Sequence, residues 1–174
     1  MNSMKTFLSW SFSAALIFCL NAPCRAIDVG KPAPALTAVL LDGGSFSLAD
    51  EIGHVVIINF WATWCAPCRE EMPALDAYYR LHKAEGLKLI AISMDDPNDE
   101  AVVKKFMSQY SFPVALKLQS QYKGFGRIWH MPMTFIVDRQ GIVRQNGSVG
   151  DPKVDLSTLD KIVTPLLKLK ADRP

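Results

Sequence analysis

The sequence predicts an α/β fold in which a mixed β-sheet is flanked by helices. Short apolar runs, such as Val55 to Phe60 and Leu87 to Ser93, have the pattern of strands that are buried on both faces. Segments with helical periodicity follow these runs, and this alternation favours parallel βαβ units with helices on both faces of the sheet. The length of 174 residues is that of one domain.

The composition excludes several classes of protein. A balance of 19 Lys and Arg against 17 Asp and Glu leaves a net charge of +2, which gives no electrostatic footprint of a nucleic-acid binder. Charged residues (21%) and aromatic residues (10%) are as frequent as in ordinary globular proteins, which argues against a disordered, collagen-like or coiled-coil chain. The four cysteines are compatible with two disulfides, a zinc site or reactive thiols.

Residues 1–26 are predicted to be a cleaved secretory signal peptide. Lys5 supplies the charged start, Leu8 to Leu20 the apolar stretch, and small residues favour cleavage after Ala26. An uncleaved inner-membrane anchor is the alternative, but the apolar stretch is shorter than the ~20 residues that a transmembrane helix needs. We therefore expect a periplasmic domain of residues 27–174.

Removal of the signal peptide changes the chemistry that the composition allows. It takes away two of the 19 basic residues and two of the four cysteines, so the mature chain is neutral and keeps Cys65 and Cys68 alone. We expect a monomer that binds no metal or other cofactor, with this cysteine pair as its redox group.

The elements expected in the mature chain begin with a hairpin around a glycine turn. The strands are expected at 36–41, 45–48, 55–60, 87–93, 114–118, 133–138 and 142–145. The helices are expected at 66–85, kinked at Pro73 and ended by Gly86, from the cap at 96–99 to about 110, weakly at 121–128, and at 156–169. In the first of these helices the side chains expected to face the core are Met72, Leu75, Tyr79 and either Leu81 or His82. In the second they are Val102, Val103, Phe106 and Met107.

The segment Cys65-Ala66-Pro67-Cys68 lies where a buried strand is followed by a helix. Unpaired N–H groups at a helix N-terminus stabilise a thiolate, which is the nucleophilic form of cysteine, so Cys65 is predicted to be reactive. Pro67 suits the first helical turn because its missing N–H is not needed there. Cys68, one turn further along, is expected to be the more buried, resolving thiol.

Two structural roles for the cysteine pair are less favoured. A disulfide that closes so short a loop would constrain the unfolded chain little. A structural zinc site needs about four ligands, and His54, His82 and His130 are scattered along the chain. The strand–helix context therefore favours redox chemistry.

The segment from Ile58 to Pro73, INFWATWCAPCREEMP, resembles the active site of the TlpA/ResA-type thioredoxin-like disulfide reductases, which are exported bacterial proteins. The WCAPC core is typical of thioredoxin-like proteins in general, whereas FWATWC, REEMP and the later MPMTFIVDRQG narrow the resemblance to this subgroup. It extends from about Gly30 to about Gly150. The resemblance implies a thioredoxin-like fold with an N-terminal hairpin and a central helix–strand insertion at about 98–118.

The resemblance also places a substrate-binding element near the cysteines. Met131-Pro132 matches the family's cis-proline, which implies that both residues lie beside Cys65 and that the Met131 backbone pairs with an extended substrate strand. The alternative is an ordinary trans proline at the start of a strand.

Four aromatic residues are divided between a docking surface and the interior. Trp64 directly precedes Cys65 and is expected to form part of a flat apolar docking surface. Trp61, Tyr122 and Trp129 are expected to be packing residues.

One carboxylate is expected to take part in catalysis. Asn59 occupies the position at which minimal thioredoxins carry a buried Asp, and Asn59 cannot titrate. Glu71 follows Cys68 by three residues, so the two project from neighbouring positions on one helix face. The matching Glu of ResA-like proteins assists proton transfer, which implies that Glu71 accepts the proton of Cys68. The alternative is a solvated surface acid like Glu70.

The expected function is that of a periplasmic thiol–disulfide oxidoreductase that reduces protein disulfides, for example in cytochrome c maturation. The resemblance implies apocytochrome c or another assembly factor as substrate, and a membrane electron donor of the DsbD or CcdA kind. A copper-binding or copper-transfer protein is the alternative, with His130, Met131 and Met133 near the thiols. A peroxiredoxin is disfavoured because the Pro-x-x-x-Thr-x-x-Cys pattern is absent at this turn.

Overall fold

The structure is a computed structural model that describes residues 27–149 and 154–169; the predicted signal peptide lies outside the described residues. The strands are β1 (Thr37–Leu40), β2 (Ser45–Ser47), β3 (Val55–Trp61), β4 (Leu87–Ser93), β5 (Val114–Gln121), β6 (Met133–Val137) and β7 (Val143–Gln145). The α-helices are α1 (Ala66–His82), α2 (Glu100–Met107) and α3 (Leu156–Lys168). Almost every expected element is therefore present.

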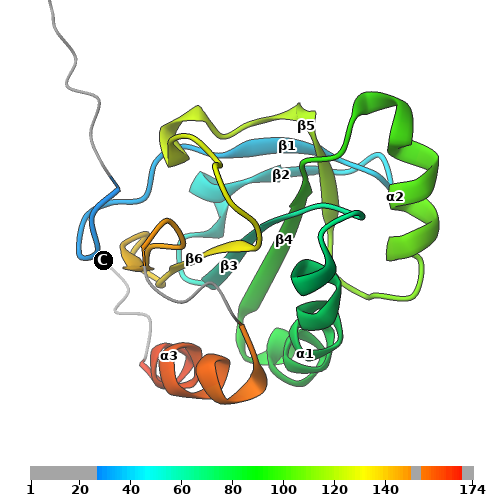
Figure 1. The fold of residues 1–174 in the computed structure, drawn as a ribbon. Coiled ribbons are helices and arrows are strands. Elements are labelled where there is room, and N and C mark those ends of the chain that lie inside the picture. The colour runs from blue at the N-terminus through cyan, green and yellow to red at the C-terminus, as the bar shows by residue number, and fades with distance from the viewer. Residues whose placement is uncertain (1–26, 150–153, 170–174) are drawn as a thin grey trace, which may run out of the picture.

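The seven strands form one mixed sheet in the order β2-β1-β5-β4-β3-β6-β7 (Figure 1). β3 pairs with β4 and β4 with β5 in parallel, whereas β6, β7, β1 and β2 join in antiparallel fashion. β5, the strand of the expected insertion, lies between the N-terminal hairpin and β4, so the insertion connects the hairpin to the rest of the sheet. The predicted fold class is confirmed.

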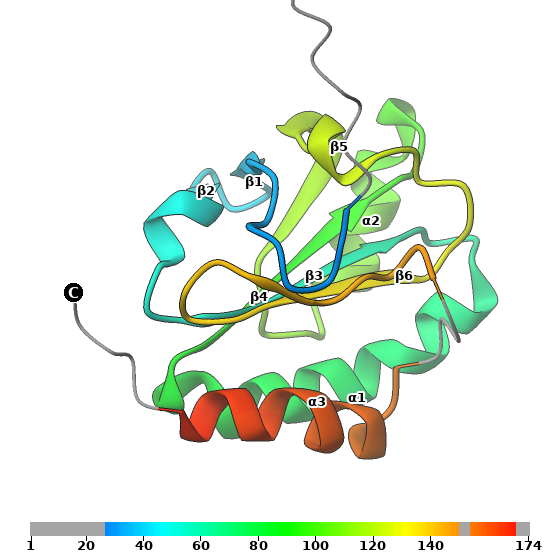
Figure 2. The same cartoon turned by 90° about the vertical axis from the view of Figure 1, so that its left-hand side faces the viewer.

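The α-helices cover one face of the sheet. Figure 2 shows α1 and α3 side by side beneath it. The buried side chains of α1, α2 and α3 all belong to one core cluster, which is completed by alternate residues of β3 and β4. The expectation of helices on both faces is therefore wrong. The opposite face is covered by side chains from the hairpin and from the segment after β5, among them Leu36, Phe46, Tyr122 and Phe125.

Local sequence signals explain where α1 begins and ends. Cys65 is the N-cap, and its sulfur accepts a hydrogen bond from the backbone N–H of Cys68. The helix continues across Pro73 to His82, and a 3₁₀ turn extends it to Glu85. Gly86 then adopts φ 92°, a left-handed conformation that costs a glycine little.

Two details of the expected elements differ from the structure, and one alternative that the sequence left open is decided. Val102 is 53% exposed, so the buried face of α2 is formed by Val103 and Met107 instead. Of the two alternatives in α1, Leu81 is exposed and His82 is half-buried. The weak helix expected at 121–128 is wrong, because β5 continues to Gln121 and only Lys123–Phe125 forms a 3₁₀ turn.

None of the helices within residues 27–149 and 154–169 is long and apolar enough to cross a bilayer.

Candidate active site

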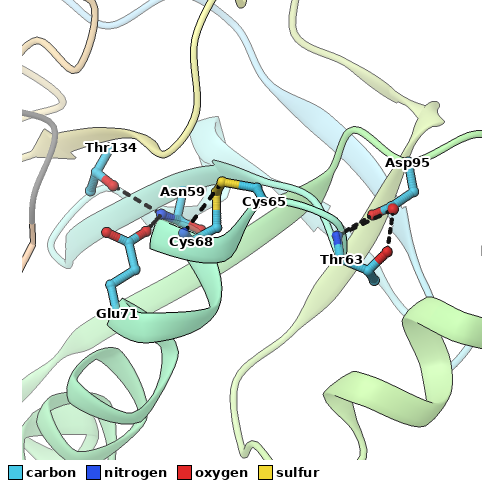
Figure 3. The surroundings of a disulfide bond; sticks show 7 residues. All are labelled: Asn59, Thr63, Cys65, Cys68, Glu71, Asp95 and Thr134. Atoms are coloured by element: carbon cyan, nitrogen blue, oxygen red, sulfur yellow. Dashed lines mark hydrogen bonds between the residues drawn. A yellow bond between two sulfur atoms is a disulfide. The ribbon is translucent and has the colours of Figure 1, made fainter.

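A disulfide joins Cys65 and Cys68 at the N-terminus of α1, just after β3 ends (Figure 3). The two Cα atoms are 5.3 Å apart, and the backbone N–H of Cys68 lies 3.3 Å from the Cys65 sulfur. Cys65 retains 5% exposure, whereas Cys68 is fully buried. This difference in access is the one expected of an attacking thiol and a resolving thiol.

The peptide bond between Met131 and Pro132 is cis, as the resemblance to the family implied. Pro132 lines a cavity of 210 Å³ together with Pro67 and Glu71, so it lies against the first turns of α1. Met131 packs against the core cluster that contains both cysteines. The structure thus brings the loop before β6 to the disulfide.

Glu71 is buried beside this site, with only 4% exposure. Asn59 of β3 donates one hydrogen bond to Glu71 Oε1 at 2.6 Å and another to Thr134 Oγ1 at 2.9 Å (Figure 3). One amide group therefore bridges the helix carboxylate and the strand that follows the cis-proline. The alternative of a solvated surface acid does not hold for Glu71, although it does hold for the exposed Glu70.

The burial of Glu71 has a direct electrostatic consequence. Burial raises the pKa of this carboxyl, and the hydrogen bonds from Asn59 and from the Val154 backbone lower it by less. The net effect moves the pKa from 4.5 to about 8. A carboxyl with a pKa near neutrality can both accept and release a proton under physiological conditions. Glu71 therefore has the chemistry of a proton-exchanging group one turn from Cys68.

A second hydrogen-bond network, which the sequence did not predict, fixes the loop before Cys65. Asp95 is 3% exposed and accepts hydrogen bonds from the Thr63 hydroxyl at 2.6 Å and from the Thr63 backbone N–H at 3.0 Å (Figure 3). The Ser93 hydroxyl donates to the same carboxylate at 2.7 Å. An acidic residue two positions after a buried parallel strand was the available signal, since such strand ends carry functional groups in open α/β sheets.

The aromatic residues divide as expected with one exception. Trp64 is 67% exposed beside the disulfide, whereas Trp61 is fully buried and its ring centroid lies 5.4 Å from that of Phe106. Tyr122 packs against Phe60. Trp129 was expected to pack in the interior, but it is 66% exposed, because its loop runs along the surface towards the cis-proline.

The structure separates one of the copper ligands that the alternative function required, Met133, from the two thiols, whereas Met131 packs against their cluster. Met133 belongs to the core cluster on one face of the sheet, whereas Cys65 and Cys68 belong to the cluster on the other. This separation follows from strand alternation, which turns Met133 and Thr134 to opposite faces. Among the described residues there is also no group of three His, Cys, Asp or Glu side chains that could hold a metal ion.

A cysteine pair at a helix N-terminus, close to a cis-proline on a thioredoxin-like fold, defines a thiol–disulfide oxidoreductase. The chain belongs to the AhpC/TSA family, whose model matches residues 29–146.

Curated relatives and solved structures agree with this class. The chain is 34% identical over 122 residues to the thiol-disulfide oxidoreductase ResA of Geobacillus kaustophilus, and the matched residues cover 69% of each chain. It is 33% identical over 141 residues to ResA of Bacillus anthracis, covering 80% of each. A crystal structure of a putative thiol:disulfide interchange protein DsbE from Chlorobium tepidum has a TM-score of 0.69 at 30% identity and covers 82% of this chain and 99% of its own.

Proposed function

We propose that the protein reduces disulfides of other exported proteins through Cys65 and Cys68. The Cys65 thiolate attacks one sulfur of a substrate disulfide, which forms a mixed disulfide and releases the other substrate sulfur as a thiolate. Cys68 then attacks the Cys65 sulfur, which closes the Cys65–Cys68 disulfide and releases the second substrate sulfur. Two electrons pass to the substrate, and its two sulfurs each take up a proton.

The resolving step requires that Cys68 lose its proton within a buried site. We assign this proton to Glu71, which lies three residues along the same helix and is buried with it. At neutral pH the carboxyl is partly ionised, because its pKa of about 8 is close to the ambient pH. A carboxylate formed there can accept the Cys68 proton and later return it when the disulfide is reduced again.

The observation that carries this proposal is the asymmetry of the two sulfurs. Cys65 is at the helix N-terminus with residual exposure beside the exposed Trp64, whereas Cys68 is inaccessible and shares its surroundings with a titratable acid. A substrate sulfur can reach Cys65 alone. We further assign Trp64, Met131 and Pro132 to substrate binding, with the Met131 backbone next to an extended substrate segment.

We further propose a periplasmic location and a membrane source of electrons. Export by the predicted signal peptide would place the domain in the periplasm, where no glutathione-type buffer keeps thiols reduced. A membrane dithiol donor of the DsbD or CcdA kind would then return two electrons to the Cys65–Cys68 disulfide. The disulfide of apocytochrome c, or of another assembly factor in cytochrome c maturation, is the proposed substrate.

Trapping of the mixed disulfide tests the assignment. A Cys68→Ser variant can attack but cannot resolve, so it is expected to accumulate a covalent adduct on Cys65 that mass spectrometry identifies. The Cys65→Ser variant is the matched control and should trap no protein. Adducts on Cys65→Ser and none on Cys68→Ser would reverse the roles of the two thiols, and adducts on neither would refute the exchange mechanism.

A further inference from the structure

A bulge in β5 turns an apolar side chain outward near the active-site end of the sheet. β1 pairs Ala38 with Ser120 and Leu40 with Ala115, so one residue of β1 lies opposite residues 116–119 of β5. The Ser120 hydroxyl closes this bulge by donating to the Leu116 carbonyl at 2.8 Å. Bulges redirect side chains, and here Leu118 is left 70% exposed.

The bulge is tied to the segment that carries the disulfide. Lys117 Nζ donates to the Met94 carbonyl at 3.0 Å, and the Met94 backbone N–H donates to the carbonyl of Trp61, the last residue of β3, at 2.8 Å. The next residue, Asp95, holds Thr63 as described above. Two hydrogen bonds therefore connect the bulge to the end of β3.

A groove of 560 Å³ opens between the bulge and the segment before the cis-proline. Its wall includes Leu118, Met94 and Ile128, and three cations, Lys117, Lys123 and Arg127. No acidic residue lines it. Lys123 and Arg127 are exposed, and neither forms an ion pair with any residue that the structure describes. Lys117 also lines a neighbouring pocket with Asp95, Asp96 and Glu100, so the free positive charge of the groove is that of Lys123 and Arg127. The groove combines this charge with apolar surface.

We propose that this groove docks an acidic segment of the protein whose disulfide is exchanged at Cys65. This inference rests on the proposed function and adds to it the charge of the substrate. The positive lining of the groove complements acidic side chains, and Leu118 offers an apolar contact between them. Because Ile128 precedes Pro132 by only four residues, a segment that leaves the groove along this loop arrives at the disulfide.

The positive charge of the groove is expected to act mainly on the rate at which the protein and its substrate associate. Charges at the rim of an interface steer association and favour partners of the opposite sign more than they add to the final affinity. The body of the mature protein is neutral, so a local positive groove is not masked by a strong overall field. Exchange with acidic protein substrates should therefore be faster at low salt.

Binding can be tested apart from redox chemistry. The probes are two fluorescent cysteine-free peptides, one rich in Asp, Glu and Leu and one with Lys in place of the acids, titrated against the oxidised protein. The double variant Lys123→Glu/Arg127→Glu should bind the acidic peptide about tenfold more weakly than the unchanged protein. Raising the salt from about 0.05 M to about 0.5 M should weaken the unchanged protein's binding similarly.

A matched control variant separates the effect of the groove on peptide binding from the effect of net charge. Lys161 and Lys168 are exposed on α3, which packs on the sheet face opposite to the one that Tyr122 and Ile128 cover. The variant Lys161→Glu/Lys168→Glu changes the net charge equally. This variant should bind the acidic peptide as the unchanged protein does. Equal binding of both peptides, or an equal loss in both double variants, would refute the acidic docking groove.

Kinetics distinguish failure of the groove from failure of the proposed function. The reduced groove variant should reduce a small aromatic disulfide at the normal rate, and a disulfide peptide with acidic flanks several-fold more slowly. Normal rates on both would refute the groove alone. No reduction of either disulfide by the unchanged protein would refute the proposed function, while the peptide titration would still decide the groove.

Discussion

Asn59 and Glu71 are joined by a 2.6 Å hydrogen bond between two buried side chains, one from the strand and one from the helix that flank the disulfide. The same amide nitrogen donates to Thr134 Oγ1. Both hydrogens of the amide are therefore used, and the bond fixes Glu71 Oε1 as an acceptor. In the protonated carboxyl the carbonyl oxygen is the better acceptor, so the hydrogen bond from Asn59 favours a proton on Oε2.

Replacement of Asn59 by Ala should raise the pKa of Glu71 further. The lost donor stabilised the ionised carboxylate, so its removal favours the protonated form. We expect the pH dependence of the resolving step, measured by stopped-flow release of substrate thiol, to move to higher pH. Thr134→Val removes the other partner of the amide and leaves the Glu71 bond intact, so its profile should move less. Equal shifts in both variants would contradict a specific role of the Asn59–Glu71 bond.

The raised pKa of Glu71 should also make stability depend on pH. In the unfolded chain the carboxyl ionises near 4.5, whereas in the folded protein it ionises near 8. The folded state therefore binds more protons between these values, and the contribution of Glu71 to stability is fully present below pH 4.5 and is lost as the pH rises through about 8. At about 1.4 kcal/mol per pKa unit, the loss amounts to a few kcal/mol.

A Glu71→Gln variant removes this ionisation and tests the prediction. Urea unfolding of the oxidised proteins should show the variant gaining stability relative to the unchanged protein as the pH is raised from about 5 to about 9. Glu70→Gln changes an exposed neighbour and should leave the pH dependence as it is. Parallel stability curves for the Glu71→Gln variant and the unchanged protein would show that the pKa of Glu71 is not raised.

Sequence patterns predicted the elements of this fold well where one signal dominated. The continuous apolar runs of β3 and β4 correspond to strands that lie between neighbours and are buried on both faces. Gly86 ends the α1 region because its positive φ suits glycine. The weak helix at 121–128 failed for the same kind of reason: β5 continues to Gln121, and Gly126, with φ 77°, ends the 3₁₀ turn Lys123–Phe125 after three residues.

The parts of the site that depend on tertiary contacts were less predictable. The motif located both cysteines and the cis-proline, and helix spacing located Glu71. The place of Asp95 just after β4 points to a functional group, but its partner Thr63 comes from a different crossover and meets it only when β3 and β4 pair. The burial of Glu71 likewise depends on the cis-proline loop and on the segment before α3, whose Pro132 and Val154 line the same cavity, whereas the adjacent Glu70 remains exposed.

Loss of the Asp95 carboxylate should destabilise the protein and loosen the loop before Cys65. Asp95→Ala leaves the Thr63 backbone N–H and the Ser93 hydroxyl without their acceptor, which should cost about 2–4 kcal/mol in chemical unfolding. Asp96→Ala, next to it on the exposed cap, should cost about 1 kcal/mol or less. Similar losses in the two variants would argue against a buried network at Asp95.

Gly147 is expected to tolerate no side chain, because it lies against the strand that follows the cis-proline. A Cβ atom there would approach the Thr134 backbone N to 2.4 Å and its carbonyl O to 2.6 Å. Relief of this overlap requires movement of backbone rather than of a side chain, so Gly147→Ala should lower the free energy of unfolding by about 2 kcal/mol or more. The movement would displace Thr134 from Asn59 and slow disulfide reduction.

Gly44→Ala is the control variant. The nearest atom to its Cβ is an exposed Asp42 side-chain oxygen at 3.1 Å, so stability and reaction rate should both stay close to normal. A Gly147→Ala protein that unfolds and reacts like Gly44→Ala would show that this close backbone contact does not support the site.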